Sequence, residues 1–158
     1  MSSPVVALLF SVALKHMGDA GAPHTRNLAL PDVHRVSHAQ LEAMACHSSC
    51  RVRAFYVPHL GVFLDDDLDV ENDEFAKSVL LHELVHHVQA SLGKYDNDIP
   101  CRARQRSEME AYSIQNDYLM AVGSATQIVL SALRGLNCPR EATIAAVLRP
   151  DSPGGAGE

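Results

Sequence analysis

Apolar residues recur at helical spacing over residues 74–92, the most regular segment of the chain. The segment contains no proline or glycine. Its apolar positions are three to four residues apart, as on one face of an α-helix: Leu81, Leu84, Val85, Val88 and Leu92. The pattern predicts a helix, with Asn72 or Asp73 as its N-cap.

A second helix is predicted over residues 107–119, which also lack proline and glycine. Gly93 and Pro100 bracket the polar connection at 94–98, so this second helix can fold back beside the first. Further helical spacing occurs at 124–133 and 140–148. We expect these two segments to be additional C-terminal helices that cover the back of the helix pair.

Residues 51–58 and 61–64 are rich in β-branched and aromatic residues and predict two short strands. The turn Pro58-His59-Leu60-Gly61 between them makes this an antiparallel β-hairpin. Upstream, Ser37 and Gln40 have the spacing of a capping box and predict a short helix that ends near Ala45. Together the elements indicate the α+β class.

The predicted first helix contains His82-Glu83-Leu84-Val85-His86. Residues four apart lie one turn above each other, so both imidazoles project from one face and can share one ion. Glu83 lies about 100° around the helix, where its carboxylate can reach a water on the metal. Zinc lowers the pKa of such a water towards ~7, and Glu83 would act as the general base.

Catalytic zinc has three protein ligands and one open position, so a third ligand is required. In metzincins it is a histidine six residues after the second, but this chain has Leu92 there and Gln89 where those proteins have glycine. The next suitable donors are Glu108 and Glu110, both on the predicted second helix. They are two residues apart and point to different helix faces.

A helix with H-E-x-x-H followed by a helix with E-x-x-A resembles the gluzincins, especially the small single-domain minigluzincins. The resemblance covers about residues 51–120 and implies a zincin-like fold, with Glu108 as third ligand, three residues before Ala111. Many gluzincins place an aspartate one turn later to orient a ligand histidine, whereas this chain has Tyr112. HELVHHVQ with E-x-E-A-Y-x-x-Q also resembles small uncharacterised bacterial proteins.

Tyr112 has two interpretations. It lies four residues after Glu108 and could donate a hydrogen bond to an oxyanion during catalysis, or it could be a tyrosine packed at the rim of the core. In zincins an edge strand beside the active-site helix pairs with extended substrate. By resemblance and position, residues 60–65 are expected to be that edge strand.

With 158 residues, 47% hydrophobic and 20% charged, the chain has the composition of one globular domain. We expect that domain at 1–149, followed by a disordered Pro- and Gly-rich tail at 150–158. The net charge of −6 argues against nucleic acid as a partner. The acidic run at 65–69 lacks the spacing of a calcium loop and predicts a solvated connection.

The N-terminal apolar run at 4–14 allows two interpretations. It has the length of a signal peptide and precedes Ala20-Gly21-Ala22, but no Lys or Arg comes before it. Otherwise it is a packed first helix, too short to span a membrane. Cytoplasmic location is slightly favoured over export. Among the three possible cysteine connectivities, Cys46–Cys50 with Cys101–Cys138 is the simplest.

Two functions are compatible with these patterns. The first is a small zinc metallopeptidase that cleaves peptide or protein substrates, with His82, His86 and Glu108 as ligands and Glu83 as base. The second is a non-catalytic, zinc-stabilised module that binds a partner protein or senses metal. Glu83 favours the enzyme, because a structural zinc site has no need of a base between its ligands.

Overall fold

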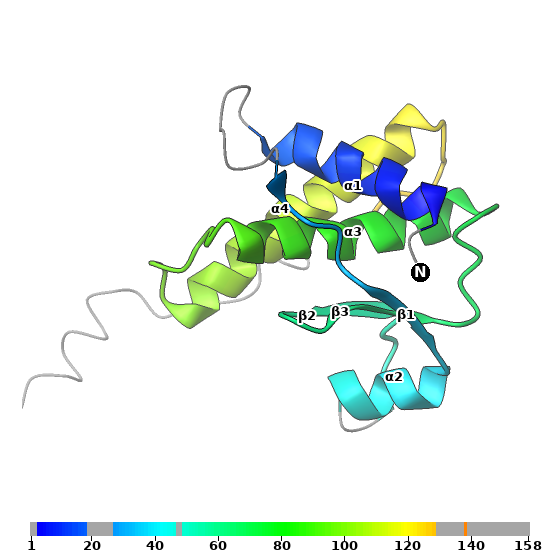
Figure 1. Cartoon of the computed structure of the whole chain (residues 1–158), viewed down its shortest axis with the longest axis horizontal. Coiled ribbons are helices and arrows are strands. Elements are labelled where there is room, and N and C mark those ends of the chain that lie inside the picture. Colours follow the sequence, from blue (N-terminus) through cyan, green and yellow to red (C-terminus); the bar gives the residue numbers. More distant parts are fainter. Residues whose placement is uncertain (1–2, 19–26, 47–48, 129–137, 139–158) are drawn as a thin grey trace, which may run out of the picture.

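The computed structural model describes residues 3–18, 27–46, 49–128 and 138. Within this part of the chain the fold is α+β, as predicted, with a small three-stranded sheet and four helices. Helix α3 lies on one side of the sheet and α2 on the other, while α1 and α4 pack against α3 (Figure 1).

The sheet consists of β1 (Val33–Val36), β2 (Ala54–Val57) and β3 (Gly61–Asp65), in the order β1-β3-β2. The antiparallel hairpin of β2 and β3 is confirmed. The expectation that residues 60–65 form an edge strand is wrong, because β1 pairs in parallel with β3 and makes it central. The edge strands are β1 and β2.

The hairpin turn depends on two residues with positive φ. His59 has φ 67 after Pro58, the combination typical of a type II turn, and Gly61 has φ 105. A Cβ on Gly61 would lie 2.2 Å from the carbonyl oxygen of Asp32, the residue that precedes β1. Glycine therefore allows the parallel strand to begin close to the hairpin.

Helix α2 (His38–Ala45) begins at the predicted capping box. The side chain of Ser37 accepts from the amide of Gln40, and the side chain of Gln40 accepts from the amide of Ser37. Leu41 is fully buried and anchors the helix beneath the sheet.

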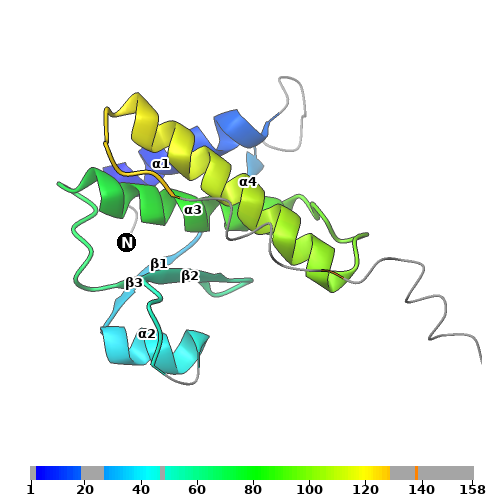
Figure 2. The same ribbon diagram turned by 180° about the vertical axis from the view of Figure 1, so that it is seen from behind.

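Helix α3 (Glu74–Ser91) and helix α4 (Pro100–Ala121) confirm the predicted helix pair. Asp73 is the N-cap of α3, and its side chain accepts from the amide of Phe75. Helix α4 starts earlier than predicted because Pro100 occupies its first turn, where a missing amide costs nothing. Figure 2, the view from behind, shows α4 crossing in front of α3, on the side hidden in Figure 1.

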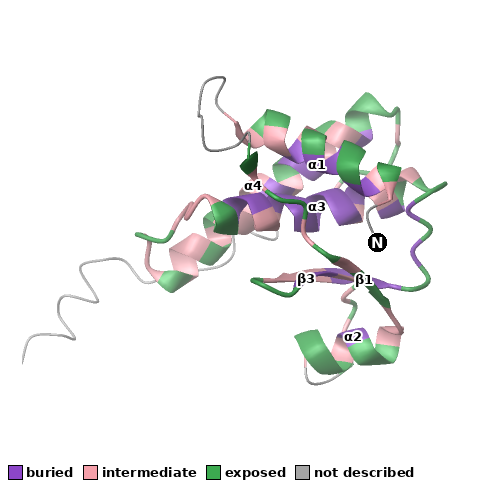
Figure 3. Ribbon diagram, in the orientation of Figure 1, coloured by how far each residue is buried: buried purple, intermediate pink, exposed green. Residues whose placement is uncertain are grey.

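The N-terminal apolar run is helix α1 (Pro4–Met17), packed on α3 as part of the domain core. Leu9 and Ala13 are buried against it. Figure 3 shows that burial concentrates along α3 and the middle of the sheet. The core includes Leu80, Leu84, Val88, Val62 and Leu64.

Residues 124–128 are not helical, so the predicted helix at 124–133 is wrong over this part. The side chain of Asn116 instead binds the backbone of Ile128, accepting from its amide at 2.7 Å and donating to its carbonyl at 3.0 Å. Residues 129–133, the predicted helix at 140–148 and the predicted tail at 150–158 lie outside the described residues. Both simplest disulfides, Cys46–Cys50 and Cys101–Cys138, are present.

No helix in the described part of the chain is long and apolar enough to cross a membrane.

Candidate metal centre

Three donor side chains from α3 and α4 meet at one point. The Nε2 atoms of His82 and His86 are 3.1 Å apart. The Glu108 carboxylate approaches both, with Oε2 at 3.3 Å from His82 Nε2 and Oε1 at 3.6 Å from His86 Nε2. All three ligand atoms lie within 4.8 Å of one another, so one ion could contact all three.

The donor set fits zinc. Two imidazole nitrogens and one carboxylate oxygen are ligands that zinc accepts, and three protein ligands leave a position open. Nδ1 of His82 is the one buried side-chain N or O atom without a hydrogen-bond partner among the described residues. No hydrogen bond to Nδ1 from a described residue therefore fixes the His82 ring. Its position depends on packing against Tyr112 and on the contacts of its Nε2 with His86 and Glu108.

Glu83 lies beside this cluster and outside it. Its side chain is buried, with 8% exposed, and points towards β2. Burial raises the pKa of Glu83, against the opposing effects of His82, His86 and a hydrogen bond from the amide of Tyr56. The carboxylate is therefore oriented by the edge strand of the sheet.

Strand β2 presents to this region the backbone edge that pairs with no other described strand. The amide of Asp65 donates to the carbonyl of Arg53, and Phe55 pairs with Phe63, so alternate residues of β2 bond to β3. The backbone groups of Ala54 and Tyr56 consequently face away from β3. This edge is the one that carries the amide bound to Glu83.

A hydrogen-bonded network surrounds the second histidine. Nδ1 of His86 lies 2.8 Å from Oε1 of Gln89 and 3.0 Å from Oγ of Ser107. The Gln89 amide nitrogen donates to the carbonyl of Ser107 and to Oε2 of Glu110, both at 3.0 Å. Lys94 and Tyr95 also donate to Glu110.

Of the two candidate glutamates, Glu108 points to the histidines and Glu110 points to Gln89, Lys94 and Tyr95. Their separation by two residues places them on different faces of α4, as expected from helix geometry. Burial would raise the pKa of Glu110, but the hydrogen bonds from Lys94, Gln89 and Tyr95 outweigh it and lower that pKa.

Electrostatics couple the three donors. Burial would raise the pKa of Glu108, but its contacts with His82 and His86 outweigh this and lower it far below the ordinary value. Burial would lower the pKa of His86, yet Glu108 and Glu83 raise it overall. The contacts within the cluster therefore favour the charged forms of both Glu108 and His86.

Tyr112 packs its ring on that of His82, with centroids 4.2 Å apart. Its hydroxyl has no hydrogen-bond partner among the described residues, and burial raises its pKa, with Glu108 and Glu83 adding to the rise. The side chain lines a cavity of about 270 Å³ together with His82, Glu83 and Ala54. Both interpretations of Tyr112 are compatible with this position.

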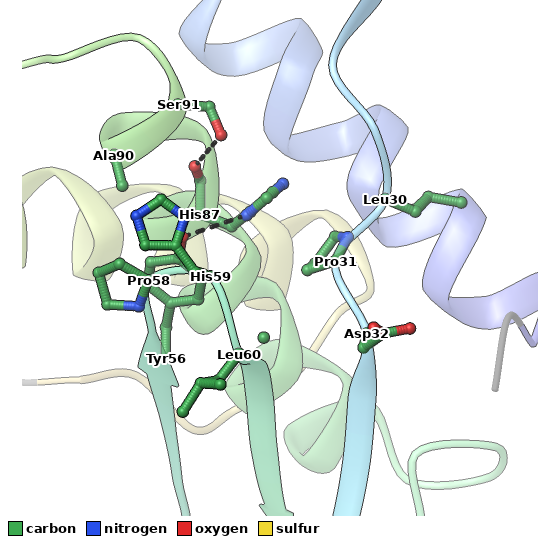
Figure 4. A pocket seen from close by; sticks show the side chains of 11 residues that line it. Leu30, Pro31, Asp32, Tyr56, Pro58, His59, Leu60, His87, Ala90 and Ser91 are labelled. Atoms are coloured by element: carbon green, nitrogen blue, oxygen red, sulfur yellow. Dashed lines mark hydrogen bonds between the residues drawn. The ribbon is translucent and has the colours of Figure 1, made fainter.

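A second cavity of about 490 Å³ lies on the other side of the donors and is lined by His86, Glu108 and Tyr56. Beyond Tyr56 is a third, of about 330 Å³ (Figure 4). His87 faces this third cavity, where its Nδ1 approaches the Tyr56 hydroxyl at 3.4 Å. It lies apart from the ligand cluster, as its angle on α3 predicts.

The acidic run at 65–69 brings Asp65, Asp66 and Asp67 close together. Asp65 is buried, and it is already engaged by His38 at 2.7 Å, Arg53 at 3.4 Å and the amide of Asp67. This carboxylate stabilises the connection after β3. The prediction of a solvated connection is therefore wrong at Asp65, whereas Asp66 and Asp67 are exposed as predicted.

The sequence predicted the three clustered side chains and the carboxylate of Glu83 beside them, but not the contacts of Gln89, Ser107 and Glu110. The available signal was a glutamine three residues after His86, at the spacing that places it on the same helix face as both histidines.

No curated protein and no solved structure matches the chain. Residues 8–143 match a protein family described as a domain of unknown function, DUF6647. The match includes most of α1, all of the sheet, and both helices that carry the donors. Because it spans most of the sequence, the chain belongs to the DUF6647 family.

Proposed function

We propose that this protein is a zinc-dependent hydrolase, most specifically a small zincin-like metallopeptidase of gluzincin type. The observation that carries the proposal is the position of Glu83. It is a buried carboxylate beside a cluster of two histidines and a glutamate, yet it is not one of the three donors. A site that only holds a metal has no use for it.

A bound zinc ion would polarise a substrate carbonyl and make water more acidic. His82, His86 and Glu108 would hold the ion. Glu83 would accept a proton from the attacking water and then deliver it to the leaving amine, as a general base and acid. The hydrogen bond from the Tyr56 amide would keep its carboxylate oriented for both transfers.

The free edge of β2 supports a peptide as substrate. An extended peptide laid along this edge could form backbone hydrogen bonds with Ala54 and with the carbonyl of Tyr56, by β-augmentation. The amide of Tyr56 is already bound to Glu83. Ala54 lines the cavity beside His82 and Tyr56 lines the one beside His86. The side chains of a peptide substrate on both sides of the scissile bond would thus each have a cavity. This favours cleavage in the interior of a peptide over cleavage at its end.

Tyr112 is proposed as the oxyanion donor. Its hydroxyl is protonated at neutral pH and has no competing partner among the described residues. A donor aimed at the developing charge of a tetrahedral intermediate stabilises the transition state more than the ground state.

The test compares wild type with Glu83→Gln at equal zinc occupancy on an unbiased peptide library. Zinc content is measured before and after chelation, and we expect about one zinc per chain in both proteins. Turnover should fall ~10⁴-fold or more in the variant, at or above the top of the range for general-base catalysis. Equal cleavage by both proteins would identify a contaminating protease.

Zinc binding without cleavage by either protein would favour the non-catalytic module. A natively folded protein without affinity for zinc would overturn both functions.

A further inference from the structure

We infer that Gln89 and Glu110 are positioning residues that fix His86 as a metal ligand through its Nε2 atom. This inference rests on the proposed zinc site. It concerns the hydrogen bonds that decide which ring nitrogen of His86 carries the proton.

The first step is the orientation of the Gln89 amide. One end of this amide lies 3.0 Å from two acceptors, the carbonyl oxygen of Ser107 and Oε2 of Glu110. An amide oxygen at that end would face two other acceptors, whereas an NH₂ group supplies the two donors they need. The nitrogen must therefore be on the Glu110 side, and the oxygen must face His86.

The second step concerns His86. With the Gln89 oxygen 2.8 Å from Nδ1, that nitrogen must be protonated, because an unprotonated Nδ1 would be a second acceptor. Ser107 is consistent with this arrangement, since its hydroxyl donates to the Gln89 oxygen at 2.6 Å. The Ser107 oxygen can then accept a hydrogen bond from Nδ1–H of His86, at 3.0 Å.

The third step is the consequence for Nε2. A neutral imidazole with its proton on Nδ1 has its lone pair on Nε2, which here points at His82 and Glu108. Metal-binding histidines commonly donate their other N–H to such an acceptor, which sets ring orientation and tautomer.

Glu110 anchors the arrangement from the other end. Its carboxylate receives hydrogen bonds from the Lys94 ammonium, the Tyr95 hydroxyl and the Gln89 amide. Gly93 and Tyr95 have positive φ angles, 61 and 75, and turn the chain sharply after α3. This turn brings the side chains of Lys94 and Tyr95 back to α4. Gln89 itself is only 3% exposed, so its side chain is confined.

The test measures the zinc dissociation constant by competition with a chromogenic chelator, for wild type, Gln89→Met and Gln115→Met. Gln115 is a matched control, since it is also buried and joins α4 to α3, through Ser78 Oγ at 3.0 Å, without contacting the donors. We expect Gln89→Met to weaken zinc binding about 10- to 100-fold. Gln115→Met should leave it unchanged.

A second measurement does not depend on the variants. Two-bond ¹H–¹⁵N correlation spectra of the zinc-free wild type, at alkaline pH where imidazoles are neutral, report the tautomer of His86. The Nδ1–H form is expected, and the Nε2–H form would overturn the inference even if Gln89→Met fails to fold.

The outcomes separate the two proposals. Tight zinc binding by wild type, with equal affinity in Gln89→Met, would overturn the role of Gln89 and leave the proposed function standing. Absence of zinc binding by wild type would overturn the proposed function and, with it, this inference.

Discussion

The Glu108 carboxylate lies 3.3 Å from Nε2 of His82, although the two residues are on different helices. Only the packing of α4 along α3 brings them together. Two residues further on, Glu110 faces away from the histidines and towards Lys94. The two glutamates therefore have different roles, and zinc binding can distinguish them.

Glu108→Gln should weaken zinc binding much more than Glu110→Gln. The first change would remove the proposed charged ligand, whereas the second would alter a group proposed to act through Gln89, with an effect within the about 10- to 100-fold typical of such groups. Chelator competition on both variants measures the difference. The opposite order would make Glu110 the third ligand.

Tyr112→Phe should lower kcat about 10²- to 10³-fold without changing zinc content, because it would remove the proposed oxyanion donor while keeping the ring on His82. Tyr118→Phe is the control on the same helix. Its hydroxyl donates to Glu74 at 2.5 Å, away from the donors, so its loss should affect stability and not kcat. An unchanged kcat in Tyr112→Phe would show that the tyrosine only packs.

Asp65→Asn should reduce the free energy of unfolding at neutral pH by about 1–3 kcal/mol, since it removes a buried charged acceptor. Burial would raise the pKa of Asp65, but Asp67, His38 and Arg53 outweigh it and lower that pKa. A lowered pKa stabilises the fold above the unfolded value of ~3.9. This stabilisation is lost as the pH falls through the folded value.

The difference between wild type and Asp65→Asn should therefore be largest near neutral pH and shrink in acid. Urea unfolding across this pH range measures it. Asp66→Asn, at an exposed neighbouring position, should change little at any pH. A constant difference down to strongly acidic pH would contradict the assigned role of the Asp65 charge.

Leu9→Ala should destabilise the protein by about 2–5 kcal/mol, the range for a buried leucine. Leu9 is 1% exposed on the face of α1 that packs into the core, whereas its neighbour Leu8 is 63% exposed. Leu8→Ala is thus the control and should have little effect in urea unfolding. Equal effects would mean that α1 is not docked on α3, as a cleavable signal peptide would require.

Short-range features of this protein followed from the sequence. Helix α3, its N-cap, the capping box before α2 and the β2–β3 hairpin each depend on residues within a few positions of one another. The placement of His82, Glu83 and His86 on one side of a helix is equally local, because helical periodicity alone dictates it.

Tertiary packing decided the remainder. Strand β1 has only four residues, two of them exposed and polar, and it becomes a strand by pairing with β3, which moves the free edge to β2. Likewise, spacing alone left Glu108 and Glu110 as alternatives, and the rotation of α4 against α3 determines which one meets the histidines. The partner of His86 is on its own helix, but Gln89 is oriented by Ser107 and Glu110 across the helix interface. Hydrogen bonds between distant segments form only after the helices have packed, so no local pattern in the sequence encodes them.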